Sequence, residues 1–244
     1  MAFDPKNLTA ARAHTGARAE TLSEIDEGLR SYMLRTYNYM ASGLLLSGIV
    51  AYATASSPTM LQAIYGTPLQ WVVMLAPLAL VFFLAARVQK MSSTAAQATF
   101  WVYAALNGVA LSYIFLAYTG VSIVRVFAIT AATFGAMSLY GYTTKRDLSG
   151  MGSFLFMGLI GIVIASIVNL FIGSSGLMWV ISVIGVLVFT GLTAYDTQQI
   201  KEMYYELDSS EVAAKKSIMG ALKLYLDFLN MFIFLMHILG VARE

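Results

Sequence analysis

The sequence contains no cysteine among its 244 residues, and it contains few charged side chains. The absence of cysteine excludes disulfide bonds, thiolate metal sites and thiol redox chemistry, while it leaves the compartment open. Charged residues make up 11% of the chain, against about 25% in an ordinary soluble domain, and hydrophobic residues make up 59%. A soluble domain of this size needs a charged exterior. The composition therefore excludes a soluble enzyme and indicates a multi-pass protein whose surface is covered largely by the lipid bilayer.

Motifs of several other functional classes are also missing. The formal net charge is only +2 and no basic tract is present, so nothing indicates nucleic acid as a partner. We find no nucleophile paired with a base, no phosphate-binding loop and no HExxH-type metal motif. The sequence thus predicts a protein that is not an enzyme and carries no cofactor.

Seven apolar runs are long enough to cross the hydrocarbon core of a bilayer, which takes about 20 helical residues. Charged or turn-forming residues separate these runs, and the loops are too short to hold a second folded domain. We therefore predict an all-α integral membrane protein with seven transmembrane helices. The predicted spans are residues 37–55, 69–86, 100–118, 124–142, 154–172, 178–200 and 217–240.

The remaining N-terminal part, residues 1–34, is predicted to be a cytoplasmic segment ahead of a transmembrane domain of residues 35–244. Residues 1–20 are polar and rich in alanine, which is typical of disorder. Residues 21–34 mix charged with large apolar side chains, a pattern that favours a short interfacial helix.

Lysine and arginine are distributed unevenly over the predicted loops. Twelve of the 15 fall on the side that holds the N-terminus and two on the other side. By the positive-inside rule the N-terminus is cytoplasmic, and seven complete crossings place the C-terminus outside. The seventh run is the weakest crossing because it carries several polar residues, and a re-entrant path is its alternative.

Two aspartates stand inside predicted spans, where an ionised side chain costs about 2.5 to 3.5 kcal/mol. Asp196 lies near the end of the sixth run, and Asp227 lies ten residues into the seventh, about 15 Å along a helix. Because the sixth run ends on the side where the seventh begins, both carboxylates fall in the cytoplasmic half of the bilayer. We expect them to meet.

Polar residues in the seventh run recur at spacings of three and four, so they share one helical face. Thr193, Asp196 and Gln199 form a shorter polar edge on the sixth run. A polar stripe in an apolar helix turns inward, which predicts that the seventh helix is central and the other six surround it. The stripe consists of Gly220, Lys223, Asp227, Asn230, Phe234 and His237.

Two carboxylates held close together in a low dielectric do not easily carry two charges. The Asp196–Asp227 pair is therefore expected to titrate in two coupled steps and to act as a proton sensor and gate. When both are ionised, their oxygens form a hard anionic site suited to Ca²⁺, which takes 6 to 8 oxygen ligands. Asn230, water and backbone carbonyls would complete such a metal site.

Plainer interpretations of the same charges remain open. Lys223 stands four residues before Asp227 and would neutralise it in a structural ion pair. Lys201 offers the same explanation for Asp196. An intramembrane aspartyl protease using both aspartates is a third reading, which requires them to converge on one water.

Arg87, at the end of the second run, is the first candidate for a latch on Asp196, and Arg35 is the competing candidate. The alternative for both is a cationic anchor that touches lipid headgroups. Asn107 and Asn169 are amides within spans and are interpreted as contacts between helices.

Four motifs along the chain resemble, in the same order, those of the Bax inhibitor-1 (transmembrane Bax inhibitor motif) family. The resemblance covers roughly residues 25–242 and is closest to the bacterial branch. The motifs run from TFG to GYTTKRDL over residues 133–148, then ASIVNLF at 165–171, AYDTQ at 194–198 and LYLDF at 224–228.

The resemblance implies a seven-helix fold with a central last helix, in a bacterial cytoplasmic (inner) membrane, and a pH-sensitive calcium leak channel. It places the proton-sensing pair on Asp196 and Asp227, and Arg87 is the nearest match to an arginine that latches the first of these. Lys223 stands where a relative has a small polar residue, and a cation there would weaken Ca²⁺ binding. Some bacterial members associate with a membrane-anchored AAA protease and inhibit it, which gives an alternative function as an interaction protein.

Overall fold

The computed structural model of the chain describes the backbone of residues 5–243 and the side chains of residues 27–243. All regular elements in this part of the chain are helices, and one isolated antiparallel bridge joins Tyr118 to Ala242. The helices are α1 (Pro5–Ala55), α2 (Pro58–Tyr65), α3 (Leu69–Arg87), the 3-10 turn η1 (Val88–Lys90), α4 (Ser93–Leu111), α5 (Tyr113–Ala117), α6 (Gly120–Thr143), α7 (Ser149–Ile172), α8 (Ser175–Glu202) and α9 (Ser210–Leu239).

Six of the described helical segments are long and apolar enough to cross a membrane. They are α3 with η1, α4 with α5, and each of α6, α7, α8 and α9. A seventh is formed when the bent pair Glu27–Ala55 and Pro58–Tyr65 is taken as one span, with a bend of 95° between its parts. The predicted all-α membrane fold is confirmed, and the seven apolar runs coincide with these segments.

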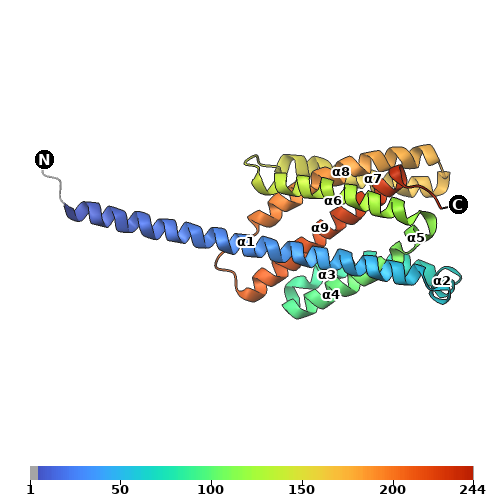
Figure 1. Cartoon of the computed structure of the whole chain (residues 1–244), viewed down its shortest axis with the longest axis horizontal. Coiled ribbons are helices and arrows are strands. Elements are labelled where there is room, and N and C mark those ends of the chain that lie inside the picture. Colours follow the sequence, from blue (N-terminus) through green and yellow to red (C-terminus); the bar gives the residue numbers. More distant parts are fainter. Residues whose placement is uncertain (1–4, 244) are drawn as a thin grey trace.

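The loops gather at the two ends of the bundle. We call the end that holds loops 88–92, 144–148 and 203–209 the charged end; α1 enters the bundle there, and the C-terminus lies at the far end (Figure 1). The last helix, α9, is continuous over 30 residues, or about 45 Å. A re-entrant path requires a reversal within the membrane, so the structure favours a full crossing for this helix.

The first helix is continuous from Pro5 to Ala55, and its N-terminal part projects beyond the bundle (Figure 1). The predicted interfacial helix over residues 21–34 therefore forms the middle of α1, without a break before the first span. The side chains of residues 1–26 and all of residues 1–4 lie outside the described part of the chain. The expectation of disorder over residues 1–20 stays a prediction.

Hydroxyl side chains set the start of several spans. The side chains of Ser92, Thr119, Ser174 and Ser209 each accept a hydrogen bond from the backbone N–H three residues later. Each of these bonds satisfies one of the four N–H groups that the first turn of a helix leaves without a partner. At the end of α7, Gly173 adopts a left-handed conformation with φ of 68°, which allows the chain to reverse into α8.

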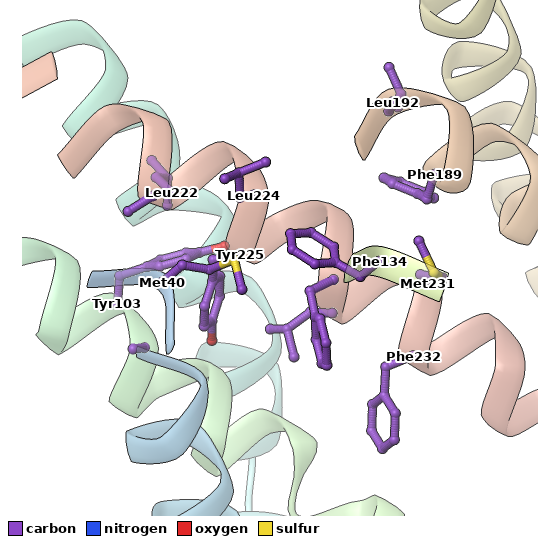
Figure 2. Packing of buried hydrophobic residues seen from close by; sticks show 14 of the residues in the cluster. Met40, Tyr103, Phe134, Phe189, Leu192, Leu222, Leu224, Tyr225, Met231 and Phe232 are labelled. Carbon is purple, nitrogen blue, oxygen red and sulfur yellow. The ribbon is translucent and has the colours of Figure 1, made fainter. Parts of the chain in front are cut away.

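The central position predicted for the last helix is confirmed, because α9 packs against α1, α4, α6 and α8. The expectation that all six other spans surround it is wrong, because α3 packs chiefly on α4 and α7 on α8. Tyr225 of α9 is fully buried, with its ring 5.9 Å from that of Phe100 and 5.6 Å from that of Tyr103. Its hydroxyl shares a hydrogen bond of 2.7 Å with Ser47 of α1. Figure 2 shows Tyr225 beside Tyr103 and Met40, while Met231 of the same helix lies toward Phe189.

One glycine brings α6 and α8 into direct backbone contact. A Cβ atom on Gly141 would lie 2.1 Å from the carbonyl oxygen of Ala194, so no other residue fits without separating the helices. This contact is two residues from Asp196 on α8. It therefore fixes the depth and rotation at which α8 presents its aspartate to α9.

Candidate functional site

A groove of about 710 Å³ lies between α7 and α9, with α8 along its floor. Most of its lining is apolar, with Phe156 and Val163 among the residues of the α7 wall. Its charged and amide side chains come from α8 and α9. They are Asp196, Gln199, Lys223, Asp227 and Asn230.

The structure brings the two predicted carboxylates together at this groove. Asp227 is almost fully buried, with 4% of its surface exposed, and Asp196 exposes 14% of its side chain. The two line the same groove from neighbouring helices, without a hydrogen bond between them among the described residues. Among the described residues, Asp227 Oδ2 is one of two buried side-chain polar atoms without a hydrogen-bond partner. A proton shared with Asp196 would satisfy that oxygen, because a protonated carboxyl group donates.

Lys223 pairs with Asp196 and not with Asp227, the partner that spacing along α9 suggested. Its Nζ lies 3.4 Å from Asp196 Oδ1 on the neighbouring helix, and no ion pair with Asp227 is present among the described residues. Lys223 therefore connects α9 to α8 and does not form the predicted structural pair along α9. The Lys223 side chain is 40% exposed, so solvent screening limits the strength of this ion pair.

Lys201 does not neutralise Asp196 in this structure. Its Nζ donates a 2.8 Å hydrogen bond to the carbonyl oxygen of Tyr142 and lies 5.2 Å from the centre of that ring. The amide of Gln198 accepts a 2.8 Å bond from the N–H of Leu148 and donates a 2.8 Å bond to the carbonyl of Arg146. Together these bonds fasten the end of α8 to loop 144–148. No spacing or charge pattern singles out Gln198, although it stands within the AYDTQ motif.

A buried chain of hydroxyl groups joins three helices behind the aspartates. Tyr37 of α1 bonds to Ser138 of α6, and Ser138 lies 3.0 Å from Thr197 of α8. Thr197 directly follows Asp196, so this chain holds the backbone of α8 against the rest of the bundle. Hydroxyl residues are common in membrane helices, and spacing along the sequence does not identify which of them meet.

The two latch candidates lie elsewhere. Arg87 is the exposed last residue of α3, a helix that packs chiefly against α2 and α4. Within the described part of the chain it forms no ion pair, and the cation beside Asp196 is Lys223. Arg35 lines a separate groove between α1 and α4. The latch role of Arg87 stays a prediction.

The remaining polar residues have local partners or lie outside the groove. Asn107 donates to the carbonyl of Tyr103 within α4, and Asn169 accepts from the N–H of Ser174 in the α7–α8 turn. Both bonds are local and therefore differ from the predicted contacts between helices. His237 is exposed near the far end of α9.

The groove offers few ligands to a cation. No group of three or more histidine, aspartate or glutamate side chains with metal-binding geometry occurs among the described residues. Asn230 donates its amide N–H to the carbonyl of Leu226, which leaves its side-chain oxygen free to accept or coordinate. A Ca²⁺ ion would have the two aspartates, this oxygen and water, and it would compete with Lys223. An ion held by so few ligands would bind weakly and exchange readily.

Comparisons with known proteins agree with this architecture. A family model described as inhibitor of apoptosis-promoting Bax1 matches residues 29–244. An uncharacterized protein of Rickettsia prowazekii, RP147, is 52% identical over 219 residues, covering 90% of this chain and 93% of the relative. The inner membrane protein YbhL of Escherichia coli is 47% identical over 229 residues, covering 93% and 98%. An uncharacterized membrane protein of Streptococcus pyogenes is 38% identical over 220 residues, covering 89% and 96%.

The residues matched by the family model span the whole bundle, and each of these relatives aligns over nearly its full length. The resemblance seen in four short motifs thus extends to the entire membrane domain. The chain is an integral multi-pass membrane protein and belongs to the Bax inhibitor-1 family.

Proposed function

We propose that this protein is a passive calcium leak channel whose opening is controlled by protonation of the Asp196–Asp227 pair. The observation that carries the proposal is the meeting of two carboxylates from α8 and α9 in a groove, with one buried oxygen left without a partner among the described residues. A buried acid is retained at a cost in stability, which favours a functional role for it.

The proposed closed state has Asp196 ionised and bound to Lys223, and Asp227 holding a proton. Asp227 is expected to hold a proton because it is buried, and because Lys223, the cation at the groove, is already paired with the negative charge of Asp196. The Lys223–Asp196 ion pair then joins α9 to α8 beside the groove. In this proposal Lys223 has the latch role for which Arg87 was the first candidate and Arg35 the second.

The proposed open state follows from protonation of Asp196. A neutral Asp196 no longer attracts Lys223, so the contact that holds α8 and α9 together at the groove weakens. Cations then enter along the polar side chains of α8 and α9. Acidification on the side of the charged end therefore opens the path.

The charged end is proposed to face the cytoplasm. Loops 88–92, 144–148 and 203–209 lie at this end, and lysines and arginines are concentrated on the same side of the chain. The E. coli relative named as an inner membrane protein supports placement in a bacterial cytoplasmic membrane.

Calcium flux in liposomes, measured from pH 6 to 8, tests the proposal. Asp196→Asn and Asp227→Asn are expected to abolish most of the pH dependence. Asp147→Asn is the matched control, since it also removes one carboxylate at the charged end. The N–H of Ser149 donates to Asp147 at 2.8 Å and lowers the pKa of that carboxyl, so it stays ionised over this range. Wild-type pH dependence in both sensor variants would refute the proposed sensor.

A further inference from the structure

A second groove, of about 660 Å³, lies between α1 and α4 at the charged end. Polar side chains at spacings of four, three and four line its α1 wall, so they occupy one face of that helix. These residues are Ser31, Arg35, Asn38 and Ser42. Trp101 of α4 lines the groove with them.

The groove is level with the start of the membrane-spanning helix α4. Tyr39 of α1 donates a 3.4 Å hydrogen bond to Gln97, which stands on the second turn of α4. Arg35 is one turn nearer the charged end than Tyr39, and so it stands level with the start of α4 at Ser93. Trp101 lies about 12 Å along α4 from that start, where aromatic side chains commonly meet the upper acyl region.

The charge in the groove is suited to a phosphate. Arg30 and Arg35 line it with one acid, Glu27, which leaves an excess of one positive charge. Arg35 is exposed and forms no ion pair or hydrogen bond with another described side chain. A guanidinium group carries five N–H donors in a planar fork that matches the oxygens of a phosphate.

The same face of α1 becomes apolar directly below the polar groove. Leu45, Ile49 and Tyr52 continue the spacing from Ser42, and they expose 65%, 58% and 64% of their surfaces. One helix face therefore presents hydrogen-bonding and cationic groups first and then apolar groups. This order matches a molecule with an anionic head and a hydrocarbon tail.

We propose that the groove between α1 and α4 binds one anionic phospholipid. The phosphate lies between Arg35 and Arg30, Trp101 packs against the glycerol and upper acyl chain, and one tail follows Leu45 and Ile49. A soluble phosphate would use the arginines but gain nothing from the apolar face, so a lipid is favoured. This site is separate from the Asp196–Asp227 groove, and it does not depend on the proposed leak.

Quenching of Trp101 by brominated phosphatidylglycerol tests the site in the full-length protein. The chain has three tryptophans, so single-tryptophan versions retain Trp101, Trp71 or Trp179 with phenylalanine at the other two positions. The vesicles consist of phosphatidylcholine with rising mole fractions of the brominated lipid. Half-maximal quenching of Trp101 is expected at a mole fraction about fivefold lower than that needed for Trp71 or Trp179, because one well-placed arginine contributes about 1 kcal/mol to binding of an anionic lipid. Equal quenching of all three tryptophans would overturn the proposal.

Charge variants separate a site from general surface attraction. Arg35→Gln in the Trp101 version is expected to remove the fivefold preference, while Arg146→Gln, which removes a cation from loop 144–148 at the same end, leaves it. Glu27→Gln removes the one acid in the groove and is expected to strengthen the preference of the Trp101 version for the anionic lipid. Because Glu27 is exposed, the substitution is not expected to disturb folding. Equal effects of Arg35→Gln and Arg146→Gln would overturn the site. Suppression of quenching by added inorganic phosphate at the same concentration as the lipid would assign the groove to a soluble anion instead.

Discussion

Replacing Lys223 by methionine gives the most direct test of the gate. The change removes the ammonium that lies 3.4 Å from Asp196 and keeps an apolar side chain of similar length. Two unit charges at this distance attract by about 5 kcal/mol at an effective dielectric constant of 20. Because Lys223 is 40% exposed, solvent screening and side-chain entropy reduce the net attraction to about 1 kcal/mol.

The expected result is a shift of the gating curve toward higher pH. The ion pair favours ionised Asp196, and in the proposed mechanism ionised Asp196 keeps the path closed. Without the cation, Asp196 takes up its proton at a higher pH, and 1 kcal/mol corresponds to about 0.7 pH units. Flux of Ca²⁺ at pH 7 is therefore expected to rise.

The assay is calcium entry into liposomes loaded with a fluorescent indicator, measured in small pH steps. Lys223→Arg preserves the charge and is expected to retain a midpoint close to that of the wild type. Lys90→Met removes a cation from an exposed position at the same end and controls for surface potential. An unchanged midpoint in Lys223→Met, or an equal shift in Lys90→Met, would show that the ion pair does not control opening.

Three further outcomes are expected. Gly141→Ala places a methyl group against the backbone of α8 and should lower the free energy of unfolding in detergent by about 1 to 3 kcal/mol. Gly135→Ala, which meets open space on the same helix, is the control and should be neutral or slightly stabilising. Equal thermal unfolding of the two variants would contradict the close contact. Gln198→Leu leaves two backbone groups of loop 144–148 without partners and should cost about 2 kcal/mol in the same assay, and wild-type stability would show that the clamp is dispensable. Deleting residues 1–20 should leave the flux and its pH dependence intact, and loss of flux would favour a function centred on the N-terminal segment.

Much of the membrane architecture was predictable because it depends on local properties of the chain. The length of each apolar run sets a span, and the spacing of Lys223, Asp227 and Asn230 sets one face of α9. The central position of α9 followed from the same stripe. The bend of 95° after Ala55 was not predictable in the same way, because Pro58 marks a break without giving the direction of the next helix.

The partners of the charged residues were harder to predict. Lys223 and Asp227 are one helical turn apart, so sequence spacing favoured a pair between them, and Lys201 stood close to Asp196 in the chain. The folded chain instead directs Lys223 across to Asp196 and Lys201 to the carbonyl of Tyr142. Long side chains reach several neighbours, and the packing of α6, α8 and α9 selects among them.

Hydropathy and helical period are properties of short stretches of chain, so they were enough to predict the membrane environment, the helical spans and the two aspartates whose burial needs explaining. Three features became visible only in the folded chain: Lys223 as the cation beside Asp196, the oxygen of Asp227 without a partner among the described residues, and the groove that the cationic face of α1 forms with α4. Those features depend on distances between segments far apart in the sequence, and these distances are set by how helices such as α6 and α8 approach at Gly141.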